Sequence, residues 1–118
     1  MQNVKDKIFT AIKDVTENVT DQHPKNWASL PAVQYCEEEN KVHQWTDNKE
    51  QNSYVRYRFD IWDEVSTSVT ALKIDEKISA LGLKRIQCMD VEDQSGYKHK
   101  IMRYDGVINP YNDRVTHI

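Results

Sequence analysis

The histidines are the side chains in this sequence best suited to hold a metal ion. There are four of them: His23, His43, His99 and His117. No two show the HxxxH or HExxH spacing of zinc sites, and no cysteine lies close to one in the sequence. His43 and His99 could meet across strands, but solvent-facing strand positions explain them better. We therefore predict no metal and no cofactor.

A catalytic nucleophile is equally hard to find. The chain has no G-x-S-x-G elbow, and neither Cys36 nor Cys88 stands at a helix start, where thiols become reactive. Both have strand-like neighbours, so we expect free apolar thiols and no disulfide. With only three glycines, the chain offers no phosphate-binding loop. An enzyme built from scattered residues such as His43, His99 and Asp60 is the least favoured alternative, and we expect no enzymatic activity.

Three consecutive glutamates, Glu37, Glu38 and Glu39, are the densest group of carboxylates. Consecutive side chains on an extended segment point to opposite sides, so these three are poorly placed to act as a paired acid and base. We predict that they form a solvated acidic turn.

One face of a central segment combines aromatic and guanidinium groups. Tyr54, Arg56, Arg58 and Trp62 alternate with apolar residues, so a strand would place them on one side of a sheet. Such a face could stack bases and bind phosphates, as in single-stranded nucleic-acid-binding modules. Arginine and aromatic residues are also enriched at protein interfaces. Because the net charge is −3 and no RNP-like pattern is present, we favour the protein interface.

The elements around that face are predicted by hydrophobic periodicity. Residues 54–62 alternate over nine positions, which is typical of a half-buried strand. A helix follows, capped by Asp63 or Ser66 and ended by Gly82. Its predicted apolar stripe consists of Val65, Val69, Ala71, Leu72, Ile74, Ile78 and Leu81. A first helix, ending near Thr20, is indicated by apolar residues at Val4, Ile8, Ala11, Ile12, Val15 and Val19.

The remaining segments predict strands and loops. We expect strands at 32–37 and 41–46, a polar loop tip at 47–53, and a hairpin of 83–92 and 97–108 around the turn 93–96. The pattern at Ile101 and Met102 favours a bulge or a strand buried on both faces. The predicted fold is therefore an α+β two-layer sandwich of order α-β-β-β-α-β-β. Its sheet is mixed or antiparallel, with two amphipathic helices on one face.

Composition and length fit one α+β domain over residues 1–118, with 109–118 as a flexible tail ending on Val115 and Ile118. The chain is polar, with 30% charged residues, but three Trp, six Tyr and two Phe are too many for a disordered chain. The start carries charges throughout and no apolar run approaches the ~20 residues that span a bilayer. We expect a soluble protein made in the cytoplasm with no membrane partner.

Across nearly its whole length, the sequence resembles the phage tail terminator, or tail-completion, family. The resemblance is carried by 57–62 (YRFDIW) followed by a helix ending in 81–85 (LGLKR), by 30–35 (LPAVQY), and by 98–106 (KHKIMRYDG). These are core and turn signals, which have low specificity.

The resemblance implies a structural virion protein that joins tail to head and involves neither cofactor nor catalysis. Such proteins assemble into a ring, commonly a hexamer, which caps the tail tube, stops its polymerisation and meets the head connector. DNA passes through the opening without specific binding. Apart from the resemblance, a closed ring needs different patches that meet head to tail, and the chain offers three: the exposed strand face (Tyr54, Arg56, Arg58 and Trp62), the loop 47–53, and the tail with its apolar Val115 and Ile118. Six copies at −3 each would carry −18, which would repel passing DNA, and Glu37, Glu38 and Glu39 are the candidate channel lining.

Overall fold

A computed structural model describes residues 5–16, 18–21, 24, 29–46, 49–108 and 115–116. Two helices are present: α1 (Lys5–Ile12) and α2 (Ser68–Ala80). The strands are β1 (Asn18–Thr20), β2 (Ala32–Thr46), β3 (Lys49–Asp63), β4 (Lys84–Val91), β5 (Lys98–Ile108) and β6 (Val115–Thr116). None of the helices in the described ranges is long and apolar enough to cross a membrane.

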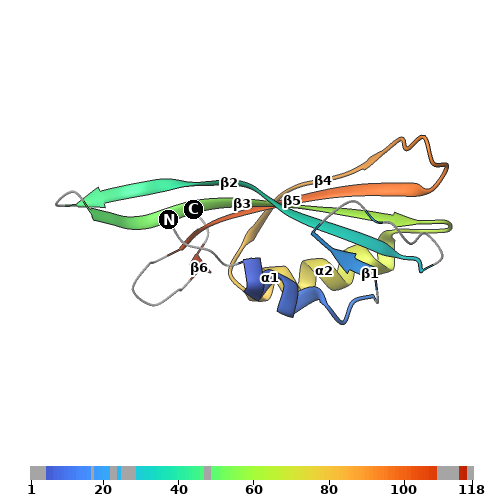
Figure 1. The fold of residues 1–118 in the computed structure, drawn as a ribbon, viewed down its shortest axis with the longest axis horizontal. Coiled ribbons are helices and arrows are strands. Elements are labelled where there is room, and N and C mark those ends of the chain that lie inside the picture. Colours follow the sequence, from blue (N-terminus) through green and yellow to red (C-terminus); the bar gives the residue numbers. More distant parts are fainter. Residues whose placement is uncertain are drawn as a thin grey trace.

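The strands form one mixed sheet in the order β1-β2-β3-β5-β4, with β6 also paired to β5. β1 is parallel to β2, and every other pair is antiparallel. Both helices lie on the same side of the sheet (Figure 1). The predicted α+β sandwich and its order α-β-β-β-α-β-β are therefore confirmed, with one further strand at the end of the chain.

β3 is the centre of the core, as its alternation predicts. Val55, Tyr57, Phe59 and Ile61 are fully buried beneath the helices. Each large apolar side chain removed from water in this way contributes about 1.5–3 kcal/mol to folding. The core is completed by side chains from β5 and both helices: Met102, Tyr104, Ile108, Ile8, Ile12, Ile74 and Ile78.

The predicted acidic turn is wrong, and so is the predicted polar loop tip over residues 49–53, while residues 47–48 lie outside the described part of the chain. Residues 32–46 form a single strand, β2, and β3 begins already at Lys49. Glu37–Glu39 lies in the middle of β2, where the register with β3 shifts and Glu38 becomes the extra residue of a bulge. Charged side chains are tolerated there because the neighbouring strand carries residues of opposite charge.

The first helix is shorter than predicted. α1 ends at Ile12 instead of continuing to Thr20, and Val19 lies in β1. After α1, the hydroxyl of Thr16 donates to the carbonyl of Pro31 (2.7 Å), and the side-chain amide of Asn18 donates to Ser29 (3.0 Å). These bonds tie the segment to the start of β2 and compete with continued helix. Val19 still packs against the core.

α2 buries a different stripe from the predicted one. Thr70, Ala71, Ile74 and Ile78 face the sheet, as expected for the latter three. A second set, predicted to be buried, is exposed: Val65 (82%), Val69 (63%) and Leu72 (70%). The cap is Thr67, not Asp63 or Ser66, and it makes no side-chain capping bond. α2 therefore presents apolar side chains to solvent at its N-terminal end.

The β4–β5 hairpin follows the predicted pattern. Gly82, with φ of 100°, ends α2 in the left-handed conformation that favours glycine. The turn closes through the amide of Gly96, which donates to the carbonyl of Asp93 (3.1 Å). The register shift lies in β4 between Arg85 and Gln87, so a bulge at Ile101–Met102 is wrong.

The sheet is much longer than the helical layer. The molecule measures 52 × 24 × 23 Å, and the end of the β2–β3 hairpin extends well beyond α1 and α2 (Figure 1). β3 loses its β5 neighbour after the Ser53–Ile108 pair, while β2 and β3 remain paired to Thr46 and Lys49. We call this two-stranded segment, residues 42–53, the arm.

Candidate protein interface

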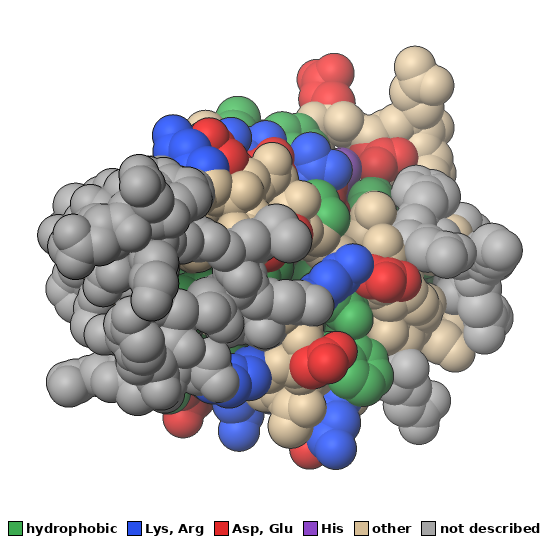
Figure 2. Space-filling model, turned by 60° about the vertical axis from the view of Figure 1, so that its left-hand side comes forward, with side chains coloured by type: hydrophobic (Ala, Val, Ile, Leu, Met, Phe, Trp, Pro, Cys, Tyr) green, Lys and Arg blue, Asp and Glu red, His purple; other side chains and the backbone are tan. Residues whose placement is uncertain are grey.

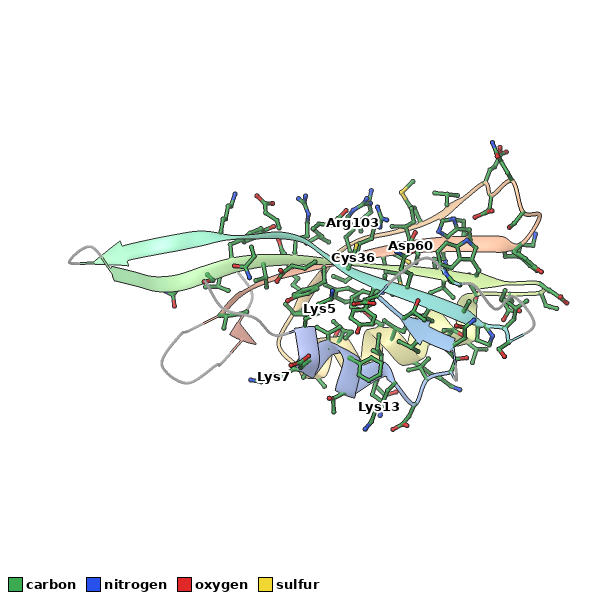
Figure 3. The ribbon with its side chains drawn as sticks, in the orientation of Figure 1. Lys5, Lys7, Lys13, Cys36, Asp60 and Arg103 are labelled. Atoms are coloured by element: carbon green, nitrogen blue, oxygen red, sulfur yellow. The ribbon has the colours of Figure 1, made fainter. Side chains whose placement is uncertain are left out.

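The sheet face away from the helices, here called the outer face, carries a continuous set of polar side chains. On β3 it consists of the even-numbered residues from Tyr54 to Trp62, because the odd-numbered ones enter the core. Figure 3 shows Asp60 and Arg103 on the sheet, with Lys7 and Lys13 on the opposite side by α1. Alternation along β3 therefore separates the core from the outer face.

Glu38 is the centre of the ion pairs on the outer face. Its carboxylate accepts from Nε of Arg103 (3.0 and 3.3 Å) and from Nε of Arg56 (3.2 Å). The Nη1 of Arg58 lies 3.8 Å away. The β2 bulge makes this possible, because Glu37 and Glu39 pair with consecutive residues of β3 and Glu38 is the extra residue between them. Its side chain is only 17% exposed, so the three guanidinium groups replace much of its water.

A second cluster surrounds His99 at the hairpin end of the outer face. Nε2 of His99 lies 2.8 Å from Asp60, and Nδ1 lies 3.2 Å from Asp93. The ring stacks on Trp62 with centroids 4.5 Å apart, and the indole N–H of Trp62 donates to Asp93 (2.7 Å). Arg58 donates to the other oxygen of Asp60 (2.8 Å). Both ring nitrogens of His99 therefore face carboxylates, and both can donate only when the ring is protonated.

Asp93 is held as an anion by its hydrogen bonds. Ser95 and then Trp62 donate to it, and these bonds lower the pKa of Asp93 from 3.8 to about 2. Its backbone contact is the amide of Ser95, which donates to Oδ1 at 2.9 Å. The same carboxylate thus fixes the turn of the hairpin and the position of the His99–Trp62 stack.

The predicted interface residues are only partly brought together. Tyr54, Arg56 and Arg58 share the outer face as expected, and Tyr54 donates to Asp105 (2.9 Å). Trp62 is 3% exposed, so its role as an exposed contact residue is wrong. Val115 belongs to β6 and pairs through its backbone with Ile108 of β5. Ile118, His23 and His117 lie outside the described residues.

The predicted acidic channel lining is divided between the two sides of the sheet. Glu37 accepts from the hydroxyl of the buried Tyr57 (2.8 Å) on the core side. Glu39 lies 3.6 Å from Arg56 and 3.2 Å from Lys41 on the outer face. Much of this acidity is therefore compensated within the protein. That Glu37, Glu38 and Glu39 line a channel stays a prediction.

Charges of both signs are interspersed on the outer face. Arg56 and Arg103 pair with Glu38, and Arg58 pairs with Asp60 at 2.8 Å. Blue and red side chains lie next to one another across the upper edge of the view in Figure 2. A surface of mixed sign resembles a polar protein interface more than a phosphate-binding groove. The nucleic-acid alternative is thereby weakened.

The scattered residues of the enzyme alternative meet only in part. Asp60 and His99 are in contact, but His43 is not near them, because His99 pairs through Trp62 with Ala32 at the opposite end of β2. Both nitrogens of His99 are already engaged. Within the described ranges, no three His, Cys, Asp or Glu side chains are grouped to hold a metal ion.

The cysteines lie on different strands with β3 and β5 between them. Cys36 is half-buried on β2 and Cys88 is exposed on β4, and both are free thiols. Three strand spacings amount to about 14 Å, well beyond the reach of a disulfide. Burial raises the pKa of the Cys36 thiol, an effect that Arg58 partly offsets. Cys36 is therefore poorly suited to act as a nucleophile.

Glu38, His99 and Arg103 are the residues that sequence reasoning missed as members of the outer face. Residue parity on β5 would have found two of them, since His99 and Arg103 are both odd-numbered on a strand whose even-numbered residues enter the core. Glu38 could not be found in this way, because its orientation depends on the bulge.

A scan against models of protein families finds no match, and no curated protein has a similar sequence. The likeness to tail terminators therefore depends on the quoted segments and on element order, and membership of that family stays a prediction.

Proposed function

We propose that this protein is a structural phage tail component that assembles into a ring, caps the tail tube and joins the tail to the head connector. In this role it ends tube polymerisation, belongs to the virion and catalyses no reaction. Its partners are further copies of itself, the tail-tube protein and the head connector. DNA passes through the ring without specific binding.

The arm is the observation that carries the assembly part of this proposal. Beyond the Ser53–Ile108 pair, no described strand adds a third partner to β2 and β3. Isolated two-stranded ribbons are marginally stable in water. A ribbon that extends beyond the helices in this way becomes more stable when its backbone and side chains contact another molecule. We infer that the arm contacts a neighbouring subunit or the tube.

The outer face supports protein contact of a polar kind. Its arginines are positioned by carboxylates before any partner arrives, so little side-chain entropy remains to be lost on binding. Arginine and tyrosine are frequent at such interfaces. The same ion pairs reduce the positive potential that single-stranded nucleic acid would require.

The experiment compares the protein alone with the protein added to polymerising tail-tube protein. Size-exclusion chromatography with light scattering measures assembly, and electron microscopy measures tube length. The proposal expects shorter, capped tubes with a ring at one end. A monomer that leaves tube length unaltered would overturn it, whereas a monomer in isolation would not, since the ring could form only on the tube.

A variant without the arm is the matched control. Replacing residues 43–52 by Asn-Gly would join Val42 directly to Ser53, which face each other in the sheet, through a two-residue hairpin turn. The core residues lie outside this segment, so the variant should keep its circular dichroism spectrum and cooperative urea transition. We expect it to lose tube capping. Capping by a folded, armless variant would show that the arm is not the contact.

A further inference from the structure

β4 forms one edge of the sheet, and no described strand pairs with its open side. Its residues 84–90 are all exposed, including Ile86 (45%) and Met89 (41%). The strand contains no proline. An exposed edge with apolar side chains is a template for pairing with another strand, and proteins usually cover or block it. β4 is therefore an edge to which another strand could be added.

The opposite edge of the sheet offers such a strand. β1 pairs only with Ala32–Gln34 of β2, so from Tyr35 onward no described strand occupies that edge. This open part of β2 begins with Tyr35 and Cys36 and continues into Glu37–Glu39. β4 begins instead with two basic residues, Lys84 and Arg85. The open edge of β2 thus offers carboxylates, and β4 offers Lys84 as a cation that has no ion pair within the described residues.

We propose that β4 of one copy pairs with the open edge of β2 of the next copy, which joins the sheets of neighbouring subunits. This inference rests on the proposed ring and names its contact. β2, β3, β5 and β4 are successively antiparallel, so β4 runs opposite to β2. Repeating the subunit in the same orientation therefore gives an antiparallel pair and a head-to-tail interface, the type that closes into rings.

Charge and side-chain orientation select one register for this pair. Lys84 stands opposite Glu39 of the next copy, and Gln87 stands opposite Cys36. All four lie on the outer face, since their partners within the sheet are Asp105, Arg56, Arg103 and Arg58, respectively. Between these two pairs each strand carries one extra residue, Ile86 in β4 and Glu38 in β2, so the register is the same before and after the bulges. Lys84 forms no ion pair within the described chain and is available.

The bulge in β4 disfavours one register of a two-fold dimer through two copies of β4, the register in which Lys84 would oppose Asp90. Lys84 is on the outer face beside Asp105, whereas Asp90 pairs with Lys100 and lies on the core side. Directly opposed residues of one sheet share a face. The head-to-tail pair meets this condition at Lys84–Glu39, Gln87–Cys36 and Cys88–Tyr35, and the two-fold pair in this register does not meet it at Lys84–Asp90.

β1 sets the end of the contact. Thr20 pairs with Gln34, so β4 must leave the neighbouring β2 after Cys88, which would oppose Tyr35. The far end of the β4–β5 hairpin rises away from the rest of the sheet (Figure 1), which leaves room for β1 of the next copy.

Cysteine cross-linking tests the register directly. In a Cys36→Ser, Cys88→Ser background, Lys84→Cys and Glu39→Cys are combined in one chain and oxidised at high protein concentration. Directly opposed strand residues lie within disulfide range. We expect a ladder of dimers, trimers and larger species on a non-reducing gel. Lys77→Cys, on the exposed face of α2, replaces Lys84→Cys in the control, which should give no ladder.

Charge reversal provides the second measurement. Lys84→Glu should weaken association about tenfold or more, and Glu39→Lys should do the same, because each brings like charges together. A variant that carries both Lys84→Glu and Glu39→Lys should regain most of the lost association. Lys73→Glu, an exposed α2 change of the same charge, should leave association unaltered. Circular dichroism confirms that each variant is folded.

The outcomes separate this contact from the proposed function. A ladder with rescue by the double reversal supports the contact, even where tube length is unaffected and the tail role fails. Rings that cap tubes without a ladder, or with no response to Lys84→Glu, overturn the contact and leave the function intact. Dimers alone overturn it in favour of a two-fold pair, and absence of both ladder and capping overturns both proposals.

Discussion

Glu38 is the residue whose replacement tests the outer-face network most directly. Glu38→Gln keeps the shape of the side chain but removes the charge that Arg56, Arg58 and Arg103 share. A single amide oxygen can still accept from one guanidinium. The other two guanidinium groups then remain close together on one sheet face, without their common counterion. The substitution thus isolates the electrostatic part of the network.

The magnitude follows from distance and exposure. Arg103 and Arg56 bond directly at 3.0 and 3.2 Å, while Arg58 lies at 3.8 Å. Hydrogen bonds to charged groups contribute about 1.5–3 kcal/mol when buried, whereas exposed pairs contribute about 0.2–1. The arginines are 25–36% exposed and Glu38 is 17% exposed, so an intermediate value applies. We expect Glu38→Gln to lower the free energy of unfolding by about 1–1.5 kcal/mol.

The assay is urea denaturation at low ionic strength, because guanidinium chloride would itself screen the network. Glu76→Gln, an exposed change of the same charge on α2, is the control and should cost less than about 0.5 kcal/mol. Salt should reduce the effect of Glu38→Gln only in part, since the pairs are partly buried. If Glu38→Gln proves no more destabilising than Glu76→Gln, the network has no structural role.

Three further predictions follow from single residues. The pKa of Asp93 is lowered from 3.8 to about 2, so its contribution to stability is full above pH 4 and is lost as the pH falls toward 2. The Asp93→Asn variant should therefore lose less stability than the wild type over this pH range, as measured by acid denaturation. The pKa of Tyr104 is raised by burial and, to a smaller extent, by Asp75, so Tyr104 stays protonated below pH 11. Tyr104→Phe should therefore leave the tyrosinate absorbance of the native protein at 295 nm unchanged below pH 11, and any decrease would contradict the assignment. Ile74→Ala should lower the free energy of unfolding by about 2–5 kcal/mol, measured by urea denaturation. Leu72→Ala, at a site that is 70% exposed, should lower it by less than about 1 kcal/mol, and equal losses would refute the burial pattern of α2.

The central strand and the helix after it could be predicted because local patterns determine them. Nine alternating residues in β3 specify a strand with one buried face, and Gly82 specifies the end of α2. The stripe predicted for α2 is right only in part, since Ala71, Ile74 and Ile78 are buried but Val69 and Leu72 are exposed. Apolar residues occur around most of its circumference, and the choice between Leu72 and Thr70 is made by the position of the sheet.

The two ends of β2 were predicted as separate strands, but its continuity could not be predicted because its middle is stabilised by residues distant in sequence. Three consecutive glutamates carry low strand propensity and resemble a turn. In the structure, Tyr57 satisfies Glu37 and the outer-face arginines satisfy Glu38, so the strand continues through them. Tertiary contacts thus reverse a local preference. Residues 49–53 of the arm were predicted as a loop because every one of them is polar, whereas in the structure they belong to β3, which pairs with β2.

The outer face illustrates how the two kinds of information combine. Alternation in β3 places Arg56 and Arg58 on one face, and sequence alone leaves that face basic. The bulge in β2 then adds Glu38, and the β5 register adds Arg103, which together convert a basic strip into a compensated network. Because Glu38 is supplied by another strand, the choice between nucleic acid and protein as partner depends on tertiary structure. Lys84, at the open edge of β4, forms no ion pair within the described residues, and in the contact we propose it meets the carboxylate of Glu39 of a second copy.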